Sequence, residues 1–126
     1  MRLETLRPKP GWDPSAYEES IAVLAEHRDD LTYRVWGGDW CKDCRRLLPD
    51  FGAALDAAGV PDERIEANPV DGDKQGPGVE EYGIEYIPTI VVENDEGTEV
   101  ARFVEDEPVP PAVWLAEAIE SAADPA

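Results

Sequence analysis

The chain has 126 residues, 42% of them apolar, which predicts one domain with a single hydrophobic core. Its 29 acidic and 11 basic side chains give a net charge of -18, which disfavours nucleic acid and anionic membranes as partners because like charges repel. We attribute this acidity to a halophilic origin, where dissolved ions screen the self-repulsion; an ordinary acidic protein is the alternative. The first residues lack an apolar secretory signal and no run is long enough to span a membrane, which favours the cytosol.

Residues 1–12 contain prolines and show no hydrophobic period, so we expect an N-terminal arm followed by one domain over 13–126. Asp13-Pro14 predicts a helix start, because aspartate caps a helix and proline suits its first position. The predicted inward face of this helix carries Tyr17, Ile21, Leu24 and Arg28.

The chain holds two cysteines, at the junction of two predicted elements. Leu31–Trp36 is rich in β-branched and aromatic residues and predicts a strand. Apolar residues then recur with a helical period, at Cys44, Leu47, Leu48, Phe51, Leu55 and Ala58. Cys41 therefore lies where a helix begins, and the free backbone N–H groups and the helix dipole there favour a thiolate. This placement predicts that Cys41 is the nucleophile of disulfide exchange and that Cys44 resolves the mixed disulfide.

The second half of the chain predicts a short strand, a hairpin and a last helix. The strand at 64–68 follows a helix, which predicts parallel pairing with the first strand. Residues 71–77 predict a polar loop, and 79–82 at most two turns of helix. Strands at 89–92 and 100–104 flank a turn and predict a hairpin. A helix begins after Pro110-Pro111, with an inward face of Leu115, Ala116, Ile119 and Ala123 and a partly buried Trp114.

The sequence Trp40-Cys41-Lys42-Asp43-Cys44, with Ile87-Pro88-Thr89 before a later strand, resembles the thioredoxin family. Pro49 falls where thioredoxins kink their active-site helix. The resemblance covers residues 14–123. It implies an α/β thioredoxin fold, with three layers (α/β/α) around a mixed sheet of about four strands.

The resemblance also implies how substrate is bound. A cis peptide bond is expected before Pro88, and the Ile87-Pro88 backbone would pair with the main chain of the bound substrate. Trp40 would offer an apolar contact surface beside the cysteines. The alternatives are a proline at the edge of a strand and a tryptophan that only packs.

Two positions depart from thioredoxins. Val35 and Ala67 stand where thioredoxins carry a buried aspartate and a neighbouring lysine, and losing both together avoids an unpaired buried charge. The proton transfer during resolution then falls to water or to a carboxylate, with Asp39, Asp43 and Glu105 as candidates. Glu105 also falls near a glycine that lies beside the substrate groove of thioredoxins.

Lys42 and Asp43 replace the Gly-Pro pair of ordinary thioredoxins and act on Cys41 in opposite directions. Lys42 favours the Cys41 thiolate, as does the helix N-terminus, while Asp43 repels it. Both side chains are expected to be exposed, so their influence should be modest. We expect a reducing couple and not an oxidase.

These features predict a thiol–disulfide oxidoreductase that reduces protein disulfides in the cytosol through a Cys41–Cys44 dithiol/disulfide couple, in redox homeostasis. We expect a monomer without a cofactor or metal, with protein disulfides and an upstream reductase as partners. Two thiolates fill half of a zinc site, which the lone histidine His27 cannot complete. A static disulfide is disfavoured in the cytosol. The alternatives are a redox-silent binding module near Pro88, or a reductase specialised for a small thiol or one client.

Overall fold

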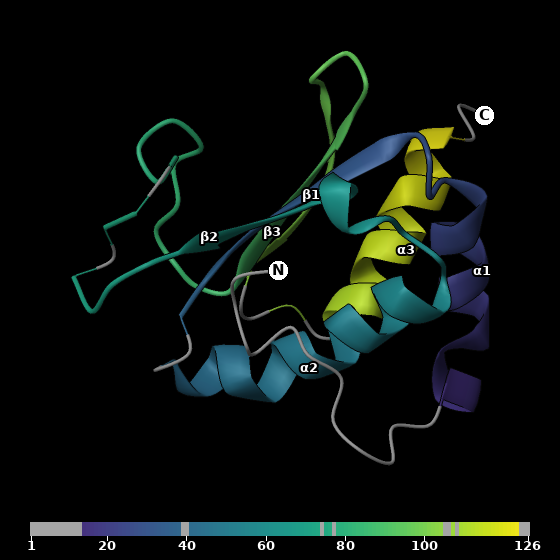
Figure 1. The fold of residues 1–126 in the computed structure, drawn as a ribbon, viewed down its shortest axis with the longest axis horizontal. Helices are drawn as coiled ribbons and strands as arrows, with labels where there is room; N and C mark the ends of the chain where they lie inside the picture. The colour runs from purple at the N-terminus through teal and green to yellow at the C-terminus, as the bar shows by residue number, and fades with distance from the viewer. Residues whose placement is uncertain are drawn as a thin grey trace.

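The computed structural model describes residues 14–38, 41–73, 75–76, 78–104, 107 and 109–123. In chain order its elements are the 3-10 helix η2 (Pro14–Tyr17), α1 (Glu18–Glu26), β1 (Leu31–Gly37), α2 (Lys42–Ala57), the 3-10 helix η3 (Asp62–Arg64), β2 (Ile65–Pro69), β3 (Thr89–Asn94), β4 (Glu99–Val104) and α3 (Pro111–Ala123) (Figure 1). The expected arm over 1–12 lies outside the described residues, so the boundary between arm and domain stays a prediction.

The strands form one mixed sheet in the order β2-β1-β3-β4. Parallel pairing of β1 with β2 is produced by α2, which crosses over between them, and β3 pairs antiparallel with both β1 and β4. The predicted strands, the parallel pair and the hairpin are therefore confirmed, and the thioredoxin fold with them.

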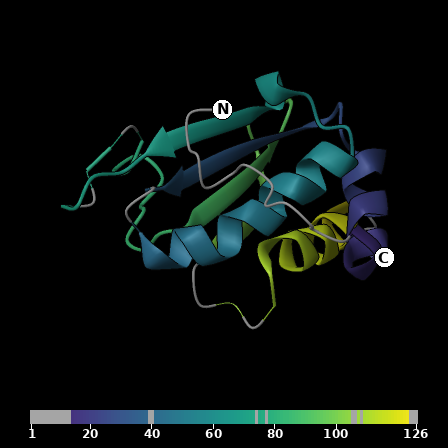
Figure 2. The ribbon, with the colours of Figure 1, turned by 60° about the horizontal axis from the view of Figure 1, so that its bottom comes forward.

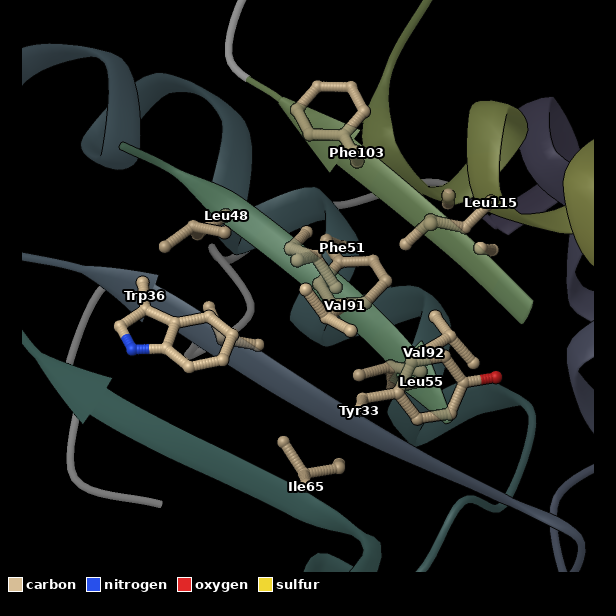
Figure 3. Close-up of a cluster of buried hydrophobic side chains, with 14 of the residues drawn as sticks. Tyr33, Trp36, Leu48, Phe51, Leu55, Ile65, Val91, Val92, Phe103 and Leu115 are labelled. Carbon is tan, nitrogen blue, oxygen red and sulfur yellow. The ribbon is translucent and has the colours of Figure 1, made fainter. Parts of the chain in front are cut away.

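All three α-helices of the described chain lie on one face of the sheet (Figures 1 and 2). The inward-facing residues of the strands and helices pack together there in a single apolar core. Its members on this face include Tyr33, Leu48, Phe51, Leu55, Val92, Phe103 and Leu115 (Figure 3). The periodicity of α2 is confirmed, because Cys44, Leu48, Phe51 and Leu55 are fully buried, while Leu47 is half-buried.

The opposite face of the sheet is covered by turns over residues 78–83 instead of a helix. The Tyr82 ring packs against Trp36 of β1, with ring centroids 4.9 Å apart. Gly78 and Gly83 bracket the segment with φ of 75° and 64°. Such left-handed backbone interrupts a helix at both ends, and the residues left between are too few to form one. One i→i+4 hydrogen bond, from the Tyr82 N–H to the Gly78 carbonyl at 3.0 Å, closes a single turn here. This lies within the predicted limit of at most two helical turns over 79–82, so the layer on this face consists of turns and not of a full helix.

The first helix differs from its prediction at both ends. Asp13 lies outside the described residues, and Pro14 begins a single 3-10 turn, so that α1 starts only at Glu18. Leu24 is fully buried as expected, but Arg28 is exposed because α1 ends at Glu26, before the inward face reaches it. No helix among the described residues is both long and apolar enough to cross a membrane.

Candidate functional site: a dithiol at the start of α2

Cys41 is the N-cap residue of α2, with φ of -81° and ψ of 123°. Its sulfur accepts the backbone N–H of Cys44 at 3.4 Å, one of the amides that a helix leaves without an internal partner. This contact and the positive end of the helix dipole both favour negative charge on the sulfur. The residue is 8% exposed, so it lies at the edge of the apolar core and not deep inside it.

Cys44 lies one turn deeper and is fully buried. Burial is the largest of the influences that raise the pKa of the Cys44 thiol; the hydrogen bond with Cys41 and the charge of Asp43 act in the same direction, against a backbone hydrogen bond at Gly38. Both cysteines are free thiols in this structure. The two sulfurs are therefore inequivalent: one lies at a helix terminus near solvent, and the other is held protonated in the core.

The Ile87-Pro88 segment lies beside Cys41. Its peptide bond is cis, as predicted. The Cys41 thiol points toward the Ile87 carbonyl oxygen, with a sulfur–oxygen distance of 4.0 Å. Ile87 and Pro88 are both buried, and β3 begins at the next residue, so the sheet holds this backbone against Cys41.

Gly37, the last residue of β1, is a site residue that the sequence analysis did not single out. A Cβ atom at this position would lie 3.1 Å from Cys44 Sγ and 3.2 Å from Leu48 Cδ1, closer than side chains normally pack. The missing side chain lets the start of α2 sit directly on the sheet. A glycine at a strand end just before the cysteines was the available signal, because glycine in a strand often marks such a close approach.

The positions of the missing buried charges are neighbours in the structure. Val35 of β1 and Ala67 of β2 are paired across the parallel strands. Val35 is fully buried and belongs to the same apolar cluster as Cys44. The strands therefore present apolar side chains, and no charged ones, at these two positions.

Two further predicted site residues, Lys42 and Asp43, are the first two residues of α2. Lys42 is exposed, and Asp43 accepts a hydrogen bond from Arg46 at 3.3 Å. Trp40, Asp39 and Glu105 lie outside the described residues, so their expected roles stay predictions. Tyr86 was not predicted: at 51% exposure it is the large hydrophobic side chain that the described chain leaves open to solvent, next to Ile87.

Within the described residues, no group of three or more histidine, cysteine, aspartate or glutamate side chains is arranged to hold a metal ion.

A mixed sheet in this order, with Cys-x-x-Cys at the start of α2 facing a cis-proline, defines a protein of the thioredoxin-fold class. The family model for thioredoxin matches residues 16–110, more than half of the chain, and the chain belongs to the thioredoxin family. No curated protein sequence matches it.

Two solved structures illustrate the likeness. Thioredoxin from Fasciola hepatica has a TM-score of 0.51 and 24% identity, over 80% of this chain and 88% of that one. Thioredoxin from Trichomonas vaginalis has a TM-score of 0.51 and 20% identity, over 94% of this chain and 97% of that one. At these identities the likeness supports the fold alone.

Proposed function

We propose that this protein is a thiol–disulfide oxidoreductase that reduces protein disulfides, with Cys41 as the attacking thiol and Cys44 as the resolving thiol. The observation that carries the proposal is the inequivalence of the two sulfurs. Cys41 Sγ accepts a helix-terminal amide hydrogen and is slightly exposed, whereas Cys44 is fully buried behind it. Membership of the thioredoxin family supports thiol–disulfide exchange as the class of reaction.

The proposed reaction has two steps. The Cys41 thiolate attacks one sulfur of the substrate disulfide, which forms a mixed disulfide and releases the other substrate sulfur as a thiolate. Cys44 then loses its proton and attacks Cys41 Sγ, which forms the Cys41–Cys44 disulfide and releases the second substrate thiolate. The protein loses two electrons and the substrate gains them, so each cycle needs an upstream dithiol reductant to restore the two thiols.

The second step needs a proton acceptor for Cys44. Burial keeps the Cys44 thiol protonated, and Val35 and Ala67 offer no carboxylate beneath it. Water, the departing substrate thiolate and the Asp43 carboxylate remain as acceptors, together with Asp39 and Glu105, which lie outside the described residues. We expect solvent to serve, because Asp43 is already paired with Arg46.

Substrate recognition is proposed to use backbone as well as side chains. The buried Ile87-Pro88 segment lies against Cys41, and its main chain would pair with an extended substrate segment around the disulfide. Trp40 and the exposed Tyr86 are proposed as apolar contacts for the substrate. A cytoplasmic location, a monomeric state, catalysis without a cofactor and a role in redox homeostasis belong to the same proposal.

Insulin reduction by dithiothreitol, followed by turbidity, tests the function. We expect the protein to accelerate precipitation over dithiothreitol alone, Cys41→Ser to abolish the acceleration, and Cys44→Ser to accumulate mixed disulfides through Cys41 in a cell extract. The two variants are matched, since each removes one sulfur and keeps the other. An unaccelerated reaction would indicate a redox-silent binding module, and adducts formed through Cys44 in Cys41→Ser would reverse the roles. Capture of one client only would indicate a specialised reductase.

A further inference from the structure

The start of α2 carries an unusual concentration of positive charge for this acidic chain. Of the seven basic side chains in the described residues, three lie within one stretch of five, at Lys42, Arg45 and Arg46. All three are exposed, and the stretch contains a single carboxylate, that of Asp43. Cys41 and Cys44 belong to the same turns of α2, so these positive charges lie close to the proposed nucleophile along the helix.

Helix stability does not explain this placement. The N-terminus of a helix carries partial positive charge, so basic residues in its first turns are disfavoured and acidic residues are favoured. Lys42 is the first residue of α2 and Arg45 is the fourth. In a chain with 29 acidic side chains, this terminus is where carboxylates would stabilise the fold most easily. The cations are therefore placed against the local electrostatic preference.

Internal ion pairing does not explain it either. Arg34, Arg64 and Arg102, on the sheet and its connections, each form an ion pair with a glutamate or aspartate. Arg46 pairs with Asp43. Lys42, Arg45 and the remote Arg28 pair with no carboxylate of the described residues, and of these three only Lys42 and Arg45 lie in the first turns of α2 beside the cysteines. Their charges are available to an external partner.

We infer that Lys42 and Arg45 form a docking patch for acidic substrates, and that the preferred client is a polypeptide disulfide with aspartate or glutamate close to its reacting cysteine. This inference rests on the proposed disulfide-reductase function and names its substrate class. Complementary charge would hold the acidic flank over α2 while the disulfide meets Cys41. On the other side of the site, the exposed Glu85 lies beside the Ile87-Pro88 segment and would repel an acidic client. We therefore place the acidic residues of the client over α2.

The patch acts at contact distance and not through the long-range field. The net charge of -18 repels acidic partners from afar, and on that basis alone a basic client would be preferred. At about 1 M salt the Debye length is about 3 Å, so distant carboxylates are screened while groups in contact still interact. Net charge and local patch therefore predict opposite client preferences under these conditions.

The test uses the reduced protein and three disulfide-linked peptides of equal length, with acidic, neutral or basic residues flanking the cysteine. Second-order rate constants are measured in 1 M KCl by chromatographic separation of thiols and disulfides. We expect the acidic peptide to react about threefold faster than the neutral peptide, as a small number of exposed ion pairs allows. The preference should narrow in 3 M KCl. Equal rates, or a preference for the basic peptide, would overturn the inference.

Arg45→Gln is the test variant and Arg28→Gln is its matched control. Arg28 is also exposed, but it lies beside Gly59, beyond the end of α2 remote from the cysteines. The readout is the ratio of acidic to neutral rates, in which the intrinsic reactivity of Cys41 cancels. We expect Arg45→Gln to lower this ratio by about half and Arg28→Gln to leave it unchanged. An equal fall in both variants would attribute the preference to overall charge and reject the patch.

Hydroxyethyl disulfide, which is small and neutral, distinguishes a failure of the docking patch from a failure of the proposed function. Reduction of this compound without an acidic preference among the peptides rejects the docking patch and leaves the proposed function standing. Failure to reduce this compound and all three peptides rejects the proposed function, and the docking patch with it.

Discussion

The two faces of the sheet are made by the same strands but are held by different forces. On the helix face, Tyr33, Val35 and Phe103 are fully buried against apolar side chains of the helices. On the opposite face, Arg34 of β1 bonds to Glu66 and Glu93, and the Tyr82 hydroxyl donates to Glu93 at 3.1 Å. The helix face is held mainly by burial of apolar surface, whereas the opposite face combines the packing of Trp36 on Tyr82 with charge and hydrogen bonds.

This difference separates the chemistry from the salt-sensitive part of the fold. Apolar burial is insensitive to pH and is strengthened by many salts, whereas exposed ion pairs weaken as salt rises. The cysteines belong to the apolar face, with Cys44 inside its cluster. In an acidic chain, the proposed redox site is thus supported by the interactions that charge disturbs least.

Phe51→Ala tests the apolar face and should have the largest effect. Phe51 is fully buried and meets the Tyr33 ring edge-on, with centroids 6.0 Å apart. Removing it should lower the free energy of unfolding by about 3–5 kcal/mol, from lost burial and the cavity left behind. Urea denaturation measures this, with Asp56→Ala on the exposed side of α2 as the control. A loss below about 1 kcal/mol would contradict the role given to this face.

Glu93→Gln tests the charged face. Glu93 is buried and is bonded to both Arg34 and Tyr82. The amide keeps the size of the side chain but weakens two charge-assisted bonds, so we expect a loss of about 1–2 kcal/mol. Glu66 is the other partner of Arg34, and the Glu66 side chain is 49% exposed. Glu66→Gln should therefore lower the free energy of unfolding by less than about 1 kcal/mol. If the two variants cost the same in urea denaturation, burial does not decide the strength of these pairs.

Alkaline pH should weaken the apolar face through Cys44. Its pKa is raised in the folded protein above the ordinary value of 9.0, so the unfolded chain loses this proton first. The contribution of the protonated Cys44 thiol to the free energy of unfolding is therefore fully present below pH 9. It falls as pH rises further, by about 1 kcal/mol per pH unit. Thermal unfolding of the reduced protein between pH 7 and 10 measures the decline, and Cys44→Ala should reduce it. A midpoint that rises over this range would show the opposite sign.

Tyr33→Phe should have the smallest effect and the opposite sign. The Tyr33 hydroxyl is buried and has no hydrogen-bond partner in the described part of the chain, and burial raises its pKa. Removing an unsatisfied hydroxyl while keeping the ring should raise the free energy of unfolding by up to about 1 kcal/mol. Calorimetry at pH 7 can resolve this change. A destabilised Tyr33→Phe protein would show that the hydroxyl is satisfied in solution.

The sequence predicts the apolar face better than the charged one. The spacing from Cys44 to Leu55 predicts both the helix and its buried side, because periodicity records which side of an element meets the core. The pairing of Arg34 with Glu93 joins residues 59 positions apart in the chain, and no local pattern announces it.

The same limit applies within the site. The motif predicts Cys41 at a helix start and the cis bond at Pro88, both of which the structure contains. The close approach of Gly37 to Cys44 depends on how deeply α2 seats on the sheet, which local sequence does not specify. The turns at 78–83 depend on backbone dihedrals that glycine permits but does not require.

The apolar pair Val35–Ala67 makes the second half of the proposed cycle dependent on its surroundings. A protein with a carboxylate at this place would carry its own base, and its rate of resolution would be an internal property of the fold. Here the acceptor for the Cys44 proton comes from outside the core. Under the proposed mechanism, the lifetime of each mixed disulfide therefore depends on the surroundings. It varies with water activity, with dissolved bases and with the basicity of the client's own departing sulfur.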